Sequence, residues 1–248
     1  MITVIDLHKE FAGRTVLESV TVEFEKGKTN LIIGQSGSGK TVLLKSIVAL
    51  HNIDGGSVLY NGRDFHKLNK RKQKDVRREM GMLFQGSALF DSYTVADNVR
   101  FPLDVFTNQS KKEKMKRVEF CLDRVNLKEA DHLLPSEISG GMQKRVAIAR
   151  AISMNPKYLF CDEPNSGLDP KTAVLIDELL MELTHEFGMT TIVNTHDLNS
   201  MVGIGEKIVF IQKGQVEWVG SKDNLLQTDN KIVKDFIYSS KILHDSSI

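Results

Sequence analysis

Apolar residues in the first part of the chain follow the period of two that is typical of β-strands. In one stretch the alternating apolar positions are Val20, Val22 and Phe24. A second stretch, residues 57–60, leads into Asn61-Gly62, a dipeptide common in tight turns. We therefore predict strands over residues 1–33 and again near residues 57–60.

Helical spacing dominates the middle of the chain. Residues 86–155 are predicted to be mostly helical, because apolar residues there recur at helical intervals. Examples are Met115, Val118, Leu122 and Val125. Residues 156–220 return to alternating strands and helices, and one helix face in this region consists of Ile176, Leu179, Leu183 and Phe187. Strands that alternate with helices predict an α/β fold, with a mainly parallel sheet covered on both faces.

Composition limits the classes of protein to consider. With 248 residues, 41% of them hydrophobic, the chain can bury a substantial core. Its net charge of +1 gives no sign of a nucleic-acid-binding surface. Cys121 and Cys161 lie in apolar patterns and are interpreted as reduced core residues. No apolar run approaches the roughly 20 residues that span a bilayer, and the N-terminus lacks a secretion signal. We therefore expect a cytoplasmic protein, with any membrane-spanning part on another chain.

A glycine-rich run between a predicted strand and a predicted helix carries the clearest chemical signal. It follows Leu31-Ile32-Ile33 and consists of Gly34, Gln35, Ser36, Gly37, Ser38, Gly39, Lys40 and Thr41. The spacing is G-x-x-x-x-G-K-[ST], the pattern of a phosphate-binding loop. Glycines let backbone N–H groups turn toward anionic oxygens, and the start of the next helix adds its dipole. Lys40 is expected to reach the β- and γ-phosphates of a nucleotide, and Thr41 to ligate Mg²⁺.

A pair of carboxylates follows a second apolar run. Residues 158–162 read Tyr-Leu-Phe-Cys-Asp, and Glu163 comes next. Parallel sheets bind ligands at the carboxyl ends of their strands. We predict that Asp162 holds the magnesium ion through water, and that Glu163 orients or deprotonates the attacking water. The alternative is an ordinary acidic start to a loop.

A third motif identifies a family. Ile138-Ser139-Gly140-Gly141-Met142-Gln143 precedes a helical run and resembles the L-S-G-G-Q signature of ABC ATPases. Further marks of that family occur in order along residues 1–220. They are Phe11 at the aromatic position that stacks on adenine, Gln85 at the end of an apolar strand, Ser166-Gly167-Leu168-Asp169 as the D-loop, and His196 as the switch histidine. Ile138, Met142 and Phe11 replace the usual leucine, glutamine and tyrosine. Since the ring face and the backbone donors are kept, ATP binding should survive these changes.

The resemblance implies a P-loop NTPase fold. Its parts would be a RecA-like core with a mainly parallel sheet, a small antiparallel β region, and an inserted helical subdomain at about residues 86–155. Residues 1–220 would form the ATPase domain and residues 221–248 a C-terminal assembly tail. ATP would lie between the phosphate loop of one copy and the signature of a second copy placed head to tail, so that one copy alone has an incomplete site.

The resemblance also assigns roles to the motif residues. The catalytic group would be Glu163, His196 and Gln85, and Mg²⁺ would be held by Thr41, Gln85 and Asp162. ATP would contact Phe11, the phosphate loop at residues 34–41, Asp169 and the signature residues Ser139, Gly140 and Gly141.

Residues 81–103 resemble the Mla/Mce-type ATPases that drive lipid transport. Those proteins commonly read F-Q-x-G-A-L-F-D-S-x-T-V-x-x-N-V-x-F-P-L, and here Gly86-Ser87 reverses the usual order. Met142 is a second shared feature, and residues 230–237 resemble their ending, with Lys231 in place of proline. The resemblance implies phospholipid transport between bacterial inner and outer membranes, from the cytoplasmic face of the inner membrane. The implied partners are a multi-span permease, a Mce-domain lipid-binding protein and, as an optional member, a STAS-domain subunit.

Other functions stay open. The first alternative is the ATPase of a small-solute importer, for methionine or another amino acid, whose corresponding region shares T-V-x-x-N-V. Methionine importers usually add a C-terminal ligand-sensing domain, which we do not expect here because the sequence ends first. A non-transport ABC ATPase is disfavoured, since the sequence has neither a coiled-coil insertion nor a tandem domain. A regulator without hydrolysis is disfavoured because Glu163 and His196 are intact.

Two apolar segments are predicted to contact partners. Residues 88–90, Ala-Leu-Phe, follow Gln85, where ABC permeases insert their coupling helix. In the tail, Val233, Phe236 and Ile237 form one helix face, which we expect a second protomer or an accessory subunit to cover. The alternative is that this face packs back on its own domain.

Overall fold

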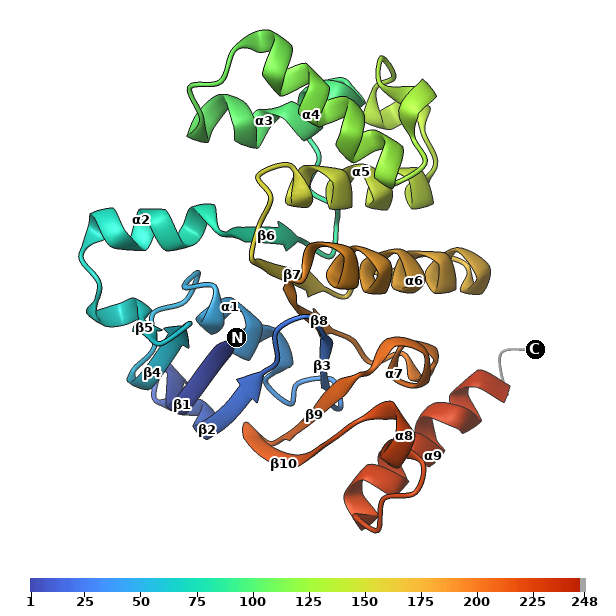
Figure 1. The fold of residues 1–248 in the computed structure, drawn as a ribbon. Coiled ribbons are helices and arrows are strands. Elements are labelled where there is room, and N and C mark those ends of the chain that lie inside the picture. The colour runs from blue at the N-terminus through green and yellow to red at the C-terminus, as the bar shows by residue number, and fades with distance from the viewer. Residues whose placement is uncertain (246–248) are drawn as a thin grey trace.

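The computed structural model describes the backbone of residues 1–245 and the side chains of residues 1–239 (Figure 1). Its strands are β1 Ile2–Phe11, β2 Arg14–Phe24, β3 Thr29–Ile33, β4 Gly55–Tyr60, β5 Arg63–Asp64, β6 Met80–Leu83, β7 Tyr158–Asp162, β8 Thr190–Asn194, β9 Lys207–Gln212 and β10 Gln215–Gly220. Its α-helices are α1 Lys40–Ile47, α2 Lys70–Arg78, α3 Val95–Phe106, α4 Lys111–Arg124, α5 Gly140–Ile152, α6 Pro170–Phe187, α7 Leu198–Ile204, α8 Lys222–Leu225 and α9 Lys231–Asp245. The strands form a four-stranded sheet, β2-β1-β4-β5, and a six-stranded sheet, β10-β9-β3-β8-β7-β6.

The larger sheet is parallel except for its edge strand β10. Strands β3, β7 and β8 are buried along their whole length, as their continuous apolar runs predict. The register pairs Asn194 with both Ile32 and Asp162, so three strands end together. The predicted α/β fold with a mainly parallel sheet is confirmed, and the chemistry described below lies at this edge of the sheet.

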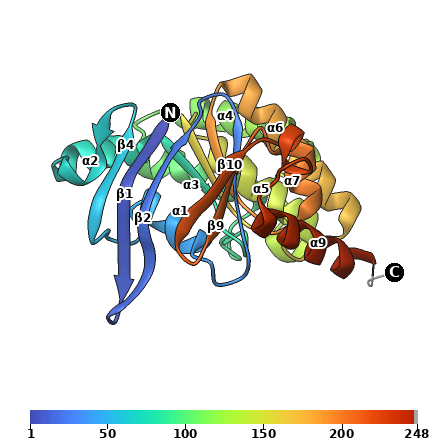
Figure 2. The ribbon, with the colours of Figure 1, turned by 90° about the horizontal axis from the view of Figure 1, so that it is seen from below.

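Side chains of β3 alternate between two hydrophobic cores. Leu31 and Ile33 belong to a core shared with helices α3, α5, α6 and α7, whereas Ile32 belongs to a core shared with α1 and the smaller sheet. Figure 2 shows α1 between the β1–β2 ribbon and the larger sheet, with α5, α6 and α7 on the far side. Both faces of β3 are therefore covered, and the loop that follows it has a rigid base.

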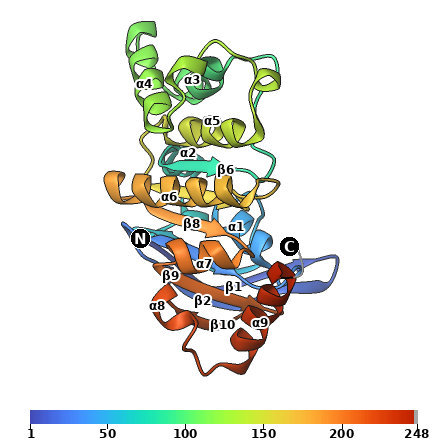
Figure 3. The ribbon, with the colours of Figure 1, turned by 90° about the vertical axis from the view of Figure 1, so that its right-hand side faces the viewer.

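Helices α3, α4 and α5 form a layer at one end of the molecule, and β10, α8 and α9 lie at the other end (Figure 3). Side-chain caps fix where the three helices begin: Thr94 caps α3, Ser110 forms a capping box with Glu113 on α4, and Ser139 caps α5. This layer falls within the segment predicted to be helical. No helix in the described part of the chain is long and apolar enough to cross a membrane.

The C-terminal helix α9 packs on its own domain. Val233 is fully buried, and Phe236 and Ile237 are each only 6% exposed. The Phe236 ring meets that of Phe210 on β9 edge-on, with 5.1 Å between the centroids. The expectation that a second protomer or accessory subunit covers this face is wrong, because the main hydrophobic core already covers it. Residues 246–248 of the predicted tail lie outside the described residues.

Candidate nucleotide-binding and catalytic site

The phosphate loop, residues 34–41, joins the end of β3 to the start of α1 and depends on its glycines. Gly34 and Gly39 adopt φ values of 148° and 108°, which side-chain-bearing residues rarely occupy. A Cβ atom on Gly34 would lie 2.2 Å from the carbonyl oxygen of Ile211, and one on Gly39 would lie 2.9 Å from Cδ2 of Leu17. The backbone therefore approaches its neighbours more closely than any side chain would allow.

Lys40 is folded into this loop. Its Nζ donates to the carbonyl oxygens of Gly34 at 2.9 Å and Gln35 at 3.0 Å, and the residue is 7% exposed. Burial lowers the pKa of Lys40, and the charges of Glu163 and Asp162 partly oppose that shift. A buried ammonium held only by neutral carbonyls gains much from a negatively charged ligand.

Thr41, at the start of α1, meets two polar side chains at the ends of neighbouring strands, Asp162 of β7 and Asn194 of β8. The Thr41 hydroxyl lies 3.4 Å from Asp162 Oδ1, and Asn194 Nδ2 donates to Asp162 Oδ1 at 2.7 Å and to Thr41 Oγ1 at 3.1 Å. A hydroxyl and one carboxylate are the kind of oxygen donors that Mg²⁺ uses together with substrate phosphates and water. The donor set therefore fits the predicted cofactor. Asn194 was not predicted; as a polar residue ending an apolar parallel strand, it could have been found from the sequence.

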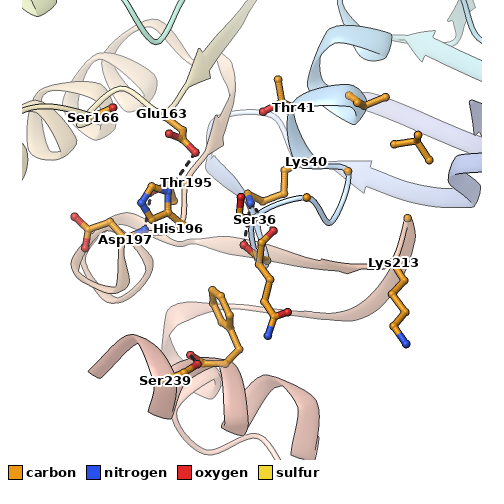
Figure 4. Close-up of a pocket in the computed structure, with 18 of the residues that line it drawn as sticks. Ser36, Lys40, Thr41, Glu163, Ser166, Thr195, His196, Asp197, Lys213 and Ser239 are labelled. Atoms are coloured by element: carbon orange, nitrogen blue, oxygen red, sulfur yellow. Dashed lines mark hydrogen bonds and ion pairs between the residues drawn. The ribbon is translucent and has the colours of Figure 1, made fainter. Parts of the chain in front are cut away.

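Glu163 sits at the centre of a second cluster. Its Oε2 accepts from Gln85 Nε2 at 3.0 Å, and its Oε1 lies 3.2 Å from His196 Nδ1, as the dashed line in Figure 4 marks. The Gln85 amide also reaches Ser166 Oγ at 3.4 Å, so these bonds orient it toward Glu163 rather than toward the Thr41–Asp162 pair. The structure thus brings together the three residues predicted to be catalytic.

Thr41, Glu163 and His196 line a cavity of about 1440 Å³, whereas Gln85, Asp162 and Asn194 are not among its lining residues. The phosphate loop and Glu163 form one part of its wall, and Thr195, His196 and Asp197 another. Figure 4 shows Lys213 and Ser239 at the periphery, from the β9–β10 turn and from α9. Phe236 of α9 also lines the cavity. The tail predicted to lie apart from the chemistry therefore contributes to the wall, which no local sequence pattern indicates.

Phe11 is not among the lining residues. Its ring is 42% exposed and meets that of His51 edge-on at 5.3 Å, with the Lys9 ammonium 4.9 Å from its centroid. Arg14, Thr15 and Val16, on the other arm of the same hairpin, do line the cavity. The adenine-stacking role predicted for Phe11 therefore has no support from the shape of the cavity in a single chain.

The signature residues also lie away from the cavity within one chain. Ser139 accepts a hydrogen bond from the backbone N–H of Met142 at 3.3 Å and so begins α5, where Gly140 is exposed. A Cβ atom on Gly141 would lie 2.7 Å from Thr172 Cγ2, so a side chain here would have to displace Thr172. Asp169 caps α6 through the backbone N–H groups of residues 171 and 172.

Two basic residues of α5 hold the segment that follows Gln85. Lys144 donates to the carbonyl of Gln85, and the Arg150 guanidinium donates to the carbonyls of Ser87 and Ala88, both at 2.7 Å. Ser87 and Ala88 have φ values of 61° and 49°, an unusual left-handed pair that these bonds help to hold. The signature helix is thereby joined to the loop after Gln85.

The predicted partner segment at residues 88–90 is only partly exposed. Leu89 packs against the main core. Phe90 is 40% exposed and belongs to an aromatic cluster in which its ring centroid lies 5.1 Å from that of Tyr93 and 4.7 Å from that of Phe101. The exposed apolar surface is therefore aromatic and extends into α3.

A parallel sheet, a glycine-rich loop feeding a helix and strand-end carboxylates define a P-loop nucleoside triphosphatase. Residues 17–166 match the family model described as "ABC transporter", and the chain belongs to that family. It is 37% identical over 243 residues to a methionine import ATP-binding protein, MetN, of Clostridioides difficile, an alignment covering 98% of this chain and 75% of the relative. It is 33% identical over 241 residues to a probable ribonucleotide transport ATP-binding protein, mkl, of Mycobacterium leprae, covering 97% of this chain and 70% of the relative.

Solved structures agree with this assignment. The dimeric, post-hydrolysis structure of the ATP-binding cassette MJ0796 with ADP and Pi has a TM-score of 0.79 and 33% identity, covering 90% of this chain and 99% of that one. The cbiO1 protein of Clostridium perfringens has a TM-score of 0.85 and 27% identity, covering 100% of this chain and 98% of that one. The chain is thus an ATP-binding cassette that hydrolyses ATP.

Proposed function

We propose that the chain is the energy-converting subunit of an ABC transporter, acting as a head-to-tail pair beside a membrane-spanning permease. The observation that carries the proposal is the placement of Glu163, with Gln85 and His196 hydrogen-bonded to it, next to the phosphate loop. A regulator that only senses nucleotide needs no such carboxylate.

The phosphate loop would bind the triphosphate through its backbone N–H groups and Lys40. Lys40 would exchange the carbonyls of Gly34 and Gln35 for phosphate oxygens, a stronger, charge-assisted contact. Thr41 and Asp162 would hold Mg²⁺, with Gln85 as a further candidate, and Asn194 would orient the two oxygens. The ion would supply charge neutralisation at the β- and γ-phosphates.

Glu163 would orient or deprotonate the water that attacks the γ-phosphate. A general base works only within hydrogen-bond reach of the proton it takes, and its carboxylate is fixed from both sides by Gln85 and His196. His196, which is 66% exposed at its side chain, would also contact the γ-phosphate. These two residues would therefore act on the same reaction from different strand ends.

A second copy would complete the site. Ser139 and Gly140, at the start of α5, are exposed and do not line the cavity of their own chain, whereas a helix N-terminus favours an anion. The dimeric MJ0796 structures support a paired arrangement for this chain. Asp169, at the start of α6, would lie at the same boundary. The exposed ring of Phe90, with Tyr93 and Phe101, would contact the permease.

Two classes of transported substrate have support. The relatives named for methionine import and ribonucleotide transport favour import of a small solute. Residues 81–103 and Met142 instead resemble the Mla/Mce-type lipid transporters, with their Mce-domain and STAS-domain partners. We place small-solute import first, because sequence similarity over 98% of this chain and 75% of the methionine-import relative supports it. Lipid transport is retained as the second candidate.

The experiment that separates them uses the complex isolated from its source with an affinity-tagged chain. Mass spectrometry identifies the co-purifying subunits, and ATP hydrolysis is then measured in vesicles with added methionine, nucleosides or phospholipid. Stimulation by a small solute and its binding protein supports import. A co-purifying Mce-domain protein, with hydrolysis dependent on phospholipid, supports lipid transport. Failure to recover any membrane protein, under conditions that preserve other ABC complexes, contradicts the transporter role.

A further inference from the structure

A buried carboxylate on α6 joins two segments that carry the catalytic residues. Asp177 is only 5% exposed. Its Oδ1 accepts from Asn165 Nδ2 at 2.8 Å, and its Oδ2 accepts from Ser200 Oγ at 2.6 Å. Asn165 Nδ2 also lies 3.2 Å from Ser200 Oγ. One side chain therefore fastens two distant parts of the sequence to the same turn of α6.

Those two parts lead directly to the candidate catalytic pair. Asn165 lies in the loop that begins at Glu163, and it lines the nucleotide cavity. Ser200 lies in α7, which begins just after His196. The same two segments meet a second time where Glu163 Oε1 lies 3.2 Å from His196 Nδ1. The Asp177 contacts thus form a second, buried connection between these two segments, in addition to the contact between Glu163 and His196 at the nucleotide cavity.

An acidic side chain is energetically costly to bury at position 177. The buried face of α6 is otherwise mostly apolar, with Ala173, Ile176, Leu180 and Leu183. The pKa of Asp177 is raised to about 6, chiefly by burial; the bonds from Ser200 and Asn165 oppose this shift, and the charges of Asp197 and Glu178 add to it. The charge of Asp177 in turn helps burial to raise the pKa of the Cys161 thiol. A leucine would cost less to bury, so stability does not explain this acid.

We propose that Asp177 is a positioning residue for ATP hydrolysis, which holds the loop after Glu163 and the start of α7 so that His196 stays against Glu163. The inference rests on the proposed function, because it requires Glu163 and His196 to act on the nucleotide. It predicts that loss of the Asp177 contacts affects turnover more than ATP binding, since Lys40 and the phosphate loop have no bond to Asp177.

The test measures steady-state phosphate release and ATP binding by the purified full chain. Asp177→Ala should lower kcat by about 10–100-fold with KM for ATP changed by less than about 3-fold, the scale expected when catalytic groups are misplaced. Asp177→Asn can still accept from Asn165 and can donate to Ser200 Oγ, so it should recover most of the lost kcat. Ser200→Ala removes the bonds to Asp177 and Asn165 but keeps the bond between Asn165 and Asp177, so it should show the same pattern at smaller size. It serves as the test if Asp177→Ala does not fold.

Thr184→Val is the matched control. Thr184 lies on the same helix, is fully buried, and bonds to the Leu180 carbonyl and to Thr191. This variant should lose stability but keep kcat per folded molecule. The proposal is overturned if Asp177→Ala keeps wild-type kcat, if Asp177→Asn is as impaired as Asp177→Ala, or if Thr184→Val loses kcat equally. If the Glu163→Gln variant, with Asp177 intact, still hydrolyses ATP at the wild-type rate, the proposed function is refuted independently of every Asp177 variant.

Discussion

Glu163 Oε1 and His196 Nδ1 lie 3.2 Å apart, although 33 positions separate the two residues. Glu163 adopts a φ of 48°, which is uncommon for a residue other than glycine, and its N–H donates to the Asn194 carbonyl at 2.9 Å. Strained backbone of this kind concentrates at functional sites. The ends of β7 and β8 therefore fix the carboxylate and the imidazole against each other.

Replacing Glu163 by glutamine should abolish most turnover and leave ATP binding intact. The amide keeps the size of the side chain but cannot accept a proton, so hydrolysis should fall by about 10²–10⁴-fold, the usual contribution of a general base. Phosphate release and nucleotide titration measure the two effects. Glu182→Gln, an exposed change on α6, should alter neither. Near-normal turnover of the Glu163 variant would remove the residue from the mechanism.

Lys40 and Ser139 are predicted to act on one ATP from opposite protomers. Lys40→Ala should weaken nucleotide binding by the single chain. Ser139→Ala should leave that binding unchanged and impair ATP-driven dimer formation. Since Ser139 also caps α5, its loss should cost about 1 kcal/mol of stability. Ser110→Ala, which removes the corresponding cap of α4, controls for that cost.

Mixing the two variants tests the head-to-tail arrangement. In a crosslinked mixed dimer, one composite site carries both changes and the other carries neither. We therefore expect one tightly bound ATP per mixed dimer, measured by equilibrium binding of labelled nucleotide. A mixed dimer that binds none would mean that each site is built from a single chain.

Substitution by aspartate should have different effects at Phe90 and at Leu89. Phe90 is 40% exposed, so Phe90→Asp should leave the fold and ATP binding intact while preventing co-purification with the permease. Leu89 is partly buried against the core, and Leu89→Asp should lower the melting temperature, because it replaces an apolar contact by a partly desolvated carboxylate. Thermal unfolding and pull-down of the complex distinguish the two. A folded Phe90→Asp chain that still binds its permease normally would place the docking surface elsewhere.

The buried face of α9 should contribute to the stability of the single domain. Phe236→Ala removes a ring packed on Phe210 and should lower the free energy of unfolding by about 3–5 kcal/mol, the usual cost of such a cavity. Tyr238→Ala, at a position 70% exposed, should have little effect. Truncation after Thr228 should therefore destabilise the isolated chain. Urea unfolding of the three variants measures this, and equal stability throughout would show that α9 is dispensable.

The buried acid on α6 should give stability a specific pH dependence. The pKa of Asp177 rises from 3.8 to about 6 on folding, so its contribution favours the folded state fully below the unfolded value and is lost as pH rises through about 6. Asp177→Asn has no such group. The unfolding free energy of the wild type minus that of the variant should fall by on the order of 2–3 kcal/mol between about pH 4 and pH 7. A difference independent of pH would contradict the raised pKa.

Local patterns in the sequence are sufficient to predict much of the fold and the phosphate loop. The apolar runs that become β3, β7 and β8 are continuous because both sheet faces are covered, and glycines at positions 34 and 39 are needed whatever surrounds them. The grouping of Gln85, Glu163 and His196 could be expected because each follows a strand of one parallel sheet. Such features depend on short-range geometry, which a sequence displays directly.

Other features depend on packing between distant segments. Nothing near Phe236 in the sequence indicates that its ring packs against Phe210 of β9. From the sequence alone, the apolar face of α9 is therefore predicted to contact another subunit. The same holds for Asp177, whose donors Asn165 and Ser200 come from two other segments. A carboxylate next to Ile176 on an otherwise apolar face was the available signal. Phe11 matches a motif position and its ring lies edge-on to that of His51, so its adenine-stacking role stays a prediction.

Hydrogen bonds from Lys144 and Arg150 to residues 85–88 join the signature helix α5 to the loop after Gln85, so we expect the helix and the loop to move together. Separating them would break three bonds from charged donors, at about 1.5–3 kcal/mol each. We expect a displacement of this loop to be passed to α5, and so to Ser139 at its start, through these three bonds.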